Sequence, residues 1–224
     1  MGTGPISKPK LPGITGIEDF KGHMFHTARW DYDYTGGDRT GQLMEGLSDK
    51  RVGIIGTGAT AVQCIPHLSA AAADLYVFQR TPSSIDERNN RPLTDDDFND
   101  LQPGWQREWL MNFATLQSGG IADKDLVKDG WTDIAIRIRD RIINKIQDTP
   151  GASLDSVWIE AFSESDDEKM NEIRARVNTI VTEDKTAEAL KPWYRQLCKR
   201  PCFHDDYLQS FNNLSLIHIS EPTR

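Results

Sequence analysis

The sequence is poor in cysteine and contains no long hydrophobic run. Three cysteines among 224 residues are too few for a disulfide framework, which favours a reduced, cytoplasmic protein. No apolar run approaches the roughly 18 residues of a membrane-spanning helix, and the first residues lack the basic and apolar pattern of a signal peptide. Acidic residues exceed basic ones, with a net charge of −8 and an isoelectric point of about 5.1. We therefore expect neither a membrane nor a nucleic acid as a partner.

A recognisable metal-binding pattern is also missing from the sequence. Cys198, Cys202 and His204 come nearest to a zinc site, but their spacing is crowded and no second pair of ligands occurs elsewhere. We therefore predict no metal.

A glycine-rich turn is the most informative stretch of the sequence. Val52 to Ile55 is a short apolar run with β-branched residues, which predicts a buried strand. The turn that follows fits G-x-G-x-x-A and leads into helix-compatible residues, a pattern that brings a pyrophosphate close to a helix N-terminus. An ordinary glycine-rich turn between strand and helix is the alternative. The predicted dinucleotide-binding residues are Gly56, Thr57, Gly58, Ala59, Thr60 and Ala61.

The end of the next strand indicates which dinucleotide would bind. Leu75 to Phe78 is a second apolar run. An NAD site would place Asp or Glu near its end to hold the ribose 2′-hydroxyl, and no acid stands there. Arg80 occupies this position instead. Its guanidinium suits a 2′-phosphate, and Thr81 would be a second donor. We therefore predict NADP, while a solvated charge at a strand end is the alternative.

From residue 89 to 190 the pattern changes to almost pure helix. Apolar residues recur there at helical spacing in three stripes, which we interpret as helix packing. We interpret Asp95 to Asp97, and the acidic cluster from Glu164 to Glu168, as solvated helix starts. Pro66, in the helix after the glycine turn, is expected to kink or shorten that helix. The stripes are Trp105, Trp109, Phe113 and Leu116; Ile134, Ile138, Ile142 and Ile146; and Ile173, Val177, Ile180 and Val181.

A motif upstream of the glycine turn is far more specific. It follows the pattern F-x-G-x-x-x-H-x-x-x-W, with P or D next, which is the signature of Baeyer–Villiger monooxygenases. The sequence resembles this family from about Gly2 to Asn212, including Phe78 to Pro82 and Cys198 to Pro201. The signature residues are Phe20, Gly22, His26, Trp30 and Asp31.

The resemblance implies an α/β fold. It would consist of a Rossmann-like NADP-binding domain with a helical insertion, plus incomplete pieces of a FAD-binding domain. The implied division is 1–47 for the end of a FAD-domain half and a linker, 48–90 for the NADP-binding βαβ unit, 91–190 for the helical insertion, 191–212 for a return segment toward the FAD domain, and 213–224 for a non-native tail.

The resemblance also implies a function and further site residues. The parent protein would be an NADPH- and O2-dependent flavin monooxygenase, with FAD and NADP as cofactors, that converts ketones to esters or lactones. Lys199 would join Arg80 at the 2′-phosphate, and Arg200 would be the catalytic arginine at the flavin. We interpret His26 and Trp30 as structural or conformational residues. Two alternatives remain: a flavin monooxygenase that hydroxylates nitrogen or sulfur, or a catalytically incomplete NADP-binding fragment.

Some features of the family are not found in this sequence. Only one dinucleotide fingerprint occurs, at Gly56, whereas the family carries a separate one for FAD. The tail 213–224 resembles translated sequencing-adapter sequence, so we interpret it as non-native. Without the main flavin sheet, residues 1–21 and 198–212 are expected to lack apolar partners and to be poorly ordered. Residues 49–192 should fold on their own.

Overall fold

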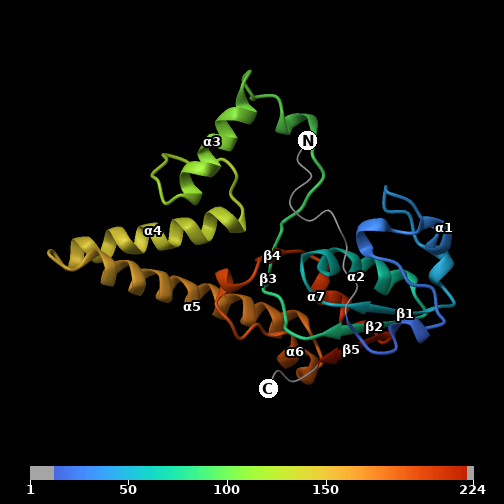
Figure 1. The fold of residues 1–224 in the computed structure, drawn as a ribbon. Helices are drawn as coiled ribbons and strands as arrows, with labels where there is room; N and C mark the ends of the chain where they lie inside the picture. The colour runs from blue at the N-terminus through green and yellow to red at the C-terminus, as the bar shows by residue number, and fades with distance from the viewer. Residues whose placement is uncertain (1–12, 221–224) are drawn as a thin grey trace. The chain divides into compact units, whose positions relative to one another are not determined.

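The computed structural model describes residues 13–220 of the chain (Figure 1). The chain divides into two compact units, Met1–Asp31 and Tyr32–Arg224. The described part of the N-terminal unit contains the 3-10 helical turns η1 (Ile17–Asp19) and η2 (Thr27–Arg29). The second unit contains the sheets and the longer helices.

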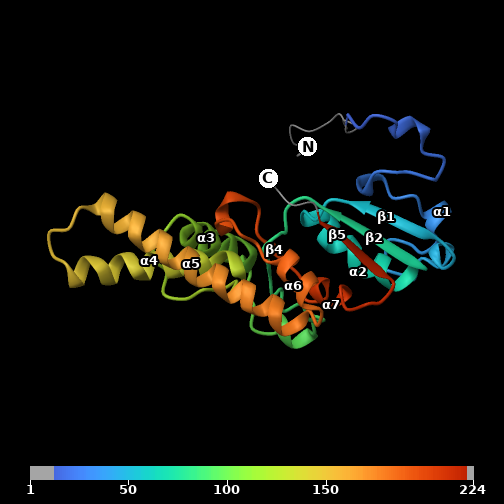
Figure 2. The same cartoon turned by 90° about the horizontal axis from the view of Figure 1, so that it is seen from below.

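A parallel three-stranded sheet with the strand order β1-β2-β5 lies in the second unit (Figure 2). Ile54, Leu75 and Val77 are buried in it, as expected for the apolar runs that predicted strands. Parallel neighbours need a crossover connection, and helix α2 provides it between β1 and β2. The short α1 (Tyr32–Thr35) and η3 (Glu45–Leu47) precede the sheet. The bounds are β1 (Arg51–Ile55), α2 (Ala59–Ala71), β2 (Asp74–Gln79) and β5 (Leu216–Ser220).

The proline in α2 does not end the helix. Of the expectation that Pro66 would kink or shorten the helix, the shortening is wrong, because α2 continues to Ala71, and the kink stays a prediction. Tertiary packing supplies most of the stability of such a helix. Here Val62, Ile65 and Leu68 are all buried, and their burial offsets the backbone hydrogen bond that proline cannot make.

The segment that returns from the helical block packs closely on this unit. Strand β3 (Ile85–Asp86) pairs with β4 (Cys202–Phe203), and α7 (Tyr207–Ser210) packs on α2. Tyr207 is only 1% exposed. The expectation that the apolar residues of 198–212 would lack partners is therefore wrong, because α2 and the neighbouring helical block supply them. The corresponding expectation for residues 1–12 falls outside the described residues.

Strand β5 lies within the tail interpreted as non-native. It pairs in parallel register with β2, from Leu75 opposite Leu216 to Gln79 opposite Ser220. An unpaired strand edge accepts any short segment of suitable alternation. The pairing is therefore compatible with a non-native tail.

The helical block contains a long antiparallel hairpin of α4 and α5, which lie side by side in both views (Figures 1 and 2). Helix α3 packs on α4, and α6 packs on α5. The acidic run predicted as a helix start forms only the short turn η4, capped by Thr94. The bounds are η4 (Asp95–Asp97), α3 (Trp105–Gln117), α4 (Gly130–Asp148), α5 (Leu154–Ile180) and α6 (Asp184–Leu190).

The second acidic cluster is not a helix start. Residues 164–168 lie in the middle of α5, where Glu164 and Glu168 form ion pairs with Arg141 of α4. Asp166 is buried, and its carboxylate accepts a hydrogen bond of 2.8 Å from the backbone N–H of Gln196. Burial raises the pKa of Asp166 above its ordinary value. The prediction failed because the opposite charges that neutralise this cluster come from another helix.

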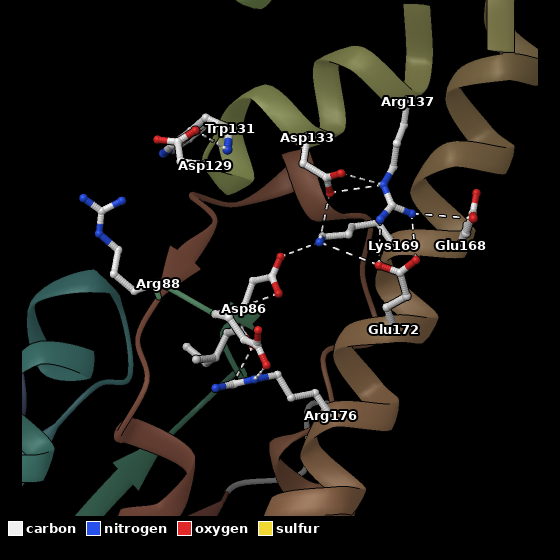
Figure 3. Close-up of polar contacts among 12 residues, drawn as sticks. Asp86, Arg88, Asp129, Trp131, Asp133, Arg137, Glu168, Lys169, Glu172 and Arg176 are labelled. Carbon is white, nitrogen blue, oxygen red and sulfur yellow. Dashed lines mark hydrogen bonds and ion pairs between the residues drawn. The ribbon is translucent and has the colours of Figure 1, made fainter. Parts of the chain in front are cut away.

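A buried lysine joins the helical hairpin to the strand that precedes it (Figure 3). The Lys169 side chain on α5 is 8% exposed, and its ammonium lies 2.5 Å from Asp86 Oδ2 and 3.0 Å from Asp133 Oδ2. Burial alone would lower the pKa of Lys169, but the two carboxylates outweigh it and raise the pKa. The ammonium thereby connects β3, α4 and α5 at one point.

A carboxylate from the return segment fixes the loop after β3. Asp205 accepts hydrogen bonds of 2.9, 3.0 and 2.9 Å from the backbone N–H groups of Arg88, Asn89 and Asn90. Burial would raise the pKa of Asp205, but these three bonds lower it overall. The helical block is thus anchored where the chain enters it and where it leaves.

We predict that Lys169→Met lowers the free energy of unfolding by about 1–3 kcal/mol, because the partly buried Asp86 carboxylate loses its ion-pair partner, whereas Asp133 keeps Arg137. Urea unfolding of the full-length protein that carries this segment, followed by tryptophan fluorescence, measures the change. Lys145→Met is the matched control, since Lys145 pairs with Glu160 and Glu164 on the exposed side of the same hairpin and should change stability little. Equal stability of the two variants would contradict the role of Lys169 in connecting β3, α4 and α5.

Candidate functional site

The glycine turn leaves the end of β1 in a conformation that only glycine adopts easily. Gly56 has a φ of +100°, in the region that side chains with a β-carbon avoid. Its N–H donates a hydrogen bond of 2.8 Å to the carbonyl of Phe78, so the turn begins tight against β2. This geometry accounts for the first glycine of the predicted motif.

The start of α2 is open for an anion. Gly58 is the N-cap residue, and no side chain accepts a hydrogen bond from the first N–H groups of this 13-residue helix. A β-carbon placed on Gly56 or Gly58 would meet nothing within 4 Å, so the space beside the turn is free. Exposed N–H groups and the positive end of the helix dipole favour a phosphate here. The first helical residues are Ala59, Thr60 and the buried Ala61.

Thr57 joins the glycine turn to the turn after β2. Its side chain is buried, and its hydroxyl donates a hydrogen bond of 3.0 Å to the carbonyl of Thr81. In return, the hydroxyl of Ser83 donates to the carbonyl of Thr57. The Thr57 hydroxyl and carbonyl are therefore both engaged within the protein, which leaves the backbone N–H of Thr57 for contact with a cofactor. The sequence analysis missed Ser83, because a serine in a turn carries no specific signal.

Arg80 and Thr81 lie at the same edge of the sheet as the glycine turn. They follow Gln79, the last residue of β2, and β2 runs parallel to β1 with Phe78 opposite Ile55. Carboxyl ends of neighbouring parallel strands form one edge, where ligands bind in open α/β sheets. Arg80 is exposed there, so its guanidinium is accessible to a charged group.

Lys199 is held near this edge by an aromatic residue that the sequence analysis did not assign to the site. The Lys199 ammonium lies 5.2 Å from the centre of the Tyr194 ring. The hydroxyl of Tyr194 donates a hydrogen bond of 2.8 Å to the carbonyl of Pro82 and accepts one of 3.1 Å from the N–H of Ser84. Both partners belong to the turn that follows Arg80, so two segments far apart in the sequence meet here.

Arg200 is exposed on the loop between η5 (Gln196–Cys198) and β4. Among residues 13–220, its guanidinium makes no hydrogen bond or ion pair with another side chain. The thiol of Cys202 donates a long hydrogen bond of 3.6 Å to its backbone carbonyl. The structure therefore places Gly56 and Arg80 at one end of the sheet and links Lys199 to the turn after Arg80 through Tyr194, whereas it assigns the Arg200 guanidinium no such link.

The signature residues form local contacts within the N-terminal unit. The Nδ1 atom of His26 accepts a hydrogen bond of 3.1 Å from the N–H of Ala28 and so caps η2. The ring of Phe20 occupies the space that a β-carbon on Gly22 would take. Trp30 packs edge-to-face on Phe25 with 5.3 Å between ring centres. Asp31 Oδ2 lies 2.8 Å from His23 Nε2.

Two features are absent from residues 13–220. No group of three His, Cys, Asp or Glu side chains is arranged to hold a metal ion in this part of the chain. None of the helices described here has the length and apolar character needed to cross a membrane.

Comparison with known proteins identifies relatives of this chain. No protein-family model matches the sequence. Neopentalenolactone D synthase of Streptomyces avermitilis is 52% identical over 219 residues, which are 97% of this chain and 36% of that protein. Baeyer–Villiger monooxygenase ATR8 of Stachybotrys chlorohalonatus is 51% identical over 213 residues, covering 93% of this chain and 33% of that protein.

Solved structures give the same result. The polycyclic ketone monooxygenase of Thermothelomyces thermophila has a TM-score of 0.81 and 38% identity, over 95% of this chain and 34% of that one. The chain matches about a third of a Baeyer–Villiger monooxygenase. The monooxygenase OTEMO in complex with FAD and NADP also matches, with a TM-score of 0.64 and 26% identity over 97% of this chain and 40% of that one.

These comparisons confirm the resemblance to Baeyer–Villiger monooxygenases that the signature and glycine motifs predicted. They also confirm the coarse fold class, an α/β fold with a parallel sheet and helices similar to Baeyer–Villiger monooxygenase structures. The chain spans only about a third of the length of the curated relatives it matches.

We predict that Gly58→Val abolishes dinucleotide binding while the fold is retained. The φ of Gly58 is −76° and the space beside it is open, so valine fits the backbone but projects where a phosphate would lie. Titration of the full-length protein with NADP+, followed by calorimetry, measures the loss. Gly56→Ala is the contrasting variant, because its backbone strain should cost about 1–3 kcal/mol of stability. Unchanged affinity in Gly58→Val would place the cofactor elsewhere.

Proposed function

We propose that this chain is the NADP-binding part of a Baeyer–Villiger monooxygenase, an enzyme that uses NADPH and O2 to convert ketones to esters or lactones. The observation that carries this proposal is the shared edge formed by the glycine turn and the Arg80 turn. The names of the relatives support it, because one of them is a ketone monooxygenase of known structure with 38% identity.

The proposed domain division follows the same reasoning. Residues 48–90 would be the Rossmann-like NADP-binding unit, with 91–190 inserted as its helical block. Residues 1–47 and 191–212 would connect to a FAD-binding domain, and 213–224 would be a non-native tail. The OTEMO complex with FAD and NADP, which matches 97% of this chain, supports the presence of both cofactors in the full protein.

The residues at the sheet edge fit NADP. The open N-terminus of α2 and the free space beside Gly58 suit the pyrophosphate, and the exposed Arg80 suits the 2′-phosphate. By resemblance to the family, Arg200 would lie at the isoalloxazine ring. When bound, NADPH would supply a hydride and FAD would activate dioxygen.

This chain's own residues would then bind and orient the nucleotide. Backbone N–H groups at the start of α2 would donate hydrogen bonds to the pyrophosphate. Arg80 and Lys199 would pair with the 2′-phosphate, which NAD lacks. Arg200 would provide a fixed guanidinium that stabilises negative charge developing on oxygen, an effect commonly worth a few kcal/mol in a site without water.

Product analysis of the full-length protein with ketone and amine substrates tests the proposed function. Ester or lactone formation from ketones supports it. Exclusive oxygenation of amines or sulfides would instead identify a hydroxylating flavin monooxygenase. The 224 residues alone should be inactive, because they contain only one dinucleotide fingerprint.

We predict that Arg80→Ala in the full-length protein weakens the use of NADPH by at least about tenfold and leaves the use of NADH nearly unchanged. The reason is that a charge-assisted hydrogen bond contributes about 1.5–3 kcal/mol. Steady-state kinetics with each nucleotide measures the effect. Arg88→Ala, an exposed arginine beyond β3, is the control and should change neither value. Equal losses with both nucleotides would show that Arg80 does not read the phosphate.

We also predict that Arg200→Ala in the full-length protein still binds NADPH but loses ketone oxygenation by orders of magnitude. The remaining NADPH oxidation should yield hydrogen peroxide, because the charge that favours oxygen transfer is gone. Ester and peroxide yields per NADPH consumed are the measurements. Arg195→Ala, an exposed arginine of the same segment, serves as the control. Ester formation near the wild-type rate would identify Arg200 as a surface residue.

A further inference from the structure

Tyr194 is a half-buried residue whose hydroxyl and ring contact different segments of the chain. Its hydroxyl joins Pro82 and Ser84, and its ring lies beneath the Lys199 ammonium. A tyrosine that served only as packing would not need both a donor and an acceptor in the same turn.

The turn that Tyr194 holds is itself tied to the glycine turn. The Thr57 hydroxyl donates a hydrogen bond to the Thr81 carbonyl, and the Ser83 hydroxyl donates one to the Thr57 carbonyl. These two bonds attach the turn to the glycine motif. Tyr194, which belongs to the return segment, attaches the same turn through the hydrogen bonds of its hydroxyl. Arg80 immediately precedes this turn and is therefore held at the end of β2 by both sets of hydrogen bonds.

The ring of Tyr194 restricts Lys199. The lysine is exposed, its backbone is extended with φ −132° and ψ 169°, and a free lysine side chain would sample many rotamers in water. Cation–π contact with an aromatic face limits that sampling. In addition, Lys199 lies on a loop that is attached to the turn through the Tyr194 hydroxyl. The ammonium is thereby kept at the same end of the sheet as Arg80.

We propose that Tyr194 is a positioning residue for the 2′-phosphate of NADP: its hydroxyl fastens the return segment to the turn after Arg80, and its ring presents Lys199 to the phosphate. This inference rests on the proposed function, because it assumes that NADP binds at this edge. It assigns to Tyr194 a share of the preference for NADP over NAD, although Tyr194 itself touches no phosphate.

Equilibrium binding of NADP+ and NAD+ to the full-length protein, measured by calorimetry, tests the proposal without dependence on turnover. Tyr194→Leu should weaken NADP+ binding about five- to tenfold, because a displaced Lys199 loses much of a charge-assisted contact. NAD+ binding should change less than about twofold, since it makes no such contact. Adding Lys199→Ala to Tyr194→Leu should cause little further loss, because both act through one ammonium.

Tyr194→Phe separates the two contacts and covers the case in which Tyr194→Leu fails to fold. It keeps the ring beneath Lys199 and removes both hydrogen bonds, so its NADP+ affinity should lie between those of wild type and Tyr194→Leu. Wild-type affinity for NADP+ in folded Tyr194→Phe, with Tyr194→Leu unfolded, overturns the proposal. Two controls on the same segment, Arg195→Ala and Lys191→Ala, should retain wild-type preference, because Arg195 is exposed and Lys191 pairs with Glu188.

The outcomes separate this proposal from the proposed function. Equal losses of NADP+ and NAD+ binding in Tyr194→Leu would make Tyr194 a purely structural residue and overturn the proposal. If Arg80→Ala lowers the NADP+ preference and the Tyr194 variants do not, only the role of Tyr194 is wrong. If the wild-type protein binds both nucleotides equally, the assignment of NADP to this site is wrong.

Discussion

The parallel pairing of β1 with β2 is the constraint on which the candidate site depends. Parallel strands end at one edge of their sheet, so the turn after β1 and the turn after β2 must lie side by side. The hydrogen bond from Gly56 to Phe78 brings these turns together at the strand ends. Helix α2 begins at the same edge because it makes the crossover between the two strands. The candidate anion site and the nearby Arg80 thus both follow from one strand register.

The return segment and the helical hairpin are attached near that edge by polar contacts. Tyr194 contacts the turn after β2, Asp205 binds the loop after β3, and Lys169 joins β3 to the helical hairpin. These ties use a phenol, a carboxylate and an ammonium, each satisfied by groups from a distant part of the sequence. A charged or polar group that is buried and fully paired costs much to disrupt on one side only. The helical block is therefore attached at these specific contacts as well as through its two chain connections.

The sequence predicted those parts of the site in which the chemistry is local. The glycine turn follows from Gly56 and Gly58, and the position of Arg80 follows from its distance to that turn. Tyr194 escaped the site assignment because its partners, Pro82 and Ser84, are more than a hundred residues away. The acidic cluster in α5 was misplaced for the same reason: polar patterning predicts solvent, whereas Arg141 on α4 supplies the counter-charge. The apolar residues of 198–212 also pack on α2 and α5, which only the tertiary fold brings next to them.

The proposed roles of Lys199 and Arg200 depend on the backbone between them. The conformation of Lys199 is extended, and Pro201 restricts Arg200 toward the same region. Successive side chains of an extended segment point to opposite sides, whereas neighbours on a helix would point in overlapping directions. Two adjacent cations on one side would repel each other and compete for one phosphate. Placed on opposite sides, they can serve two cofactors from one short segment, and the ring of Tyr194 holds Lys199 on the side of the nucleotide turn.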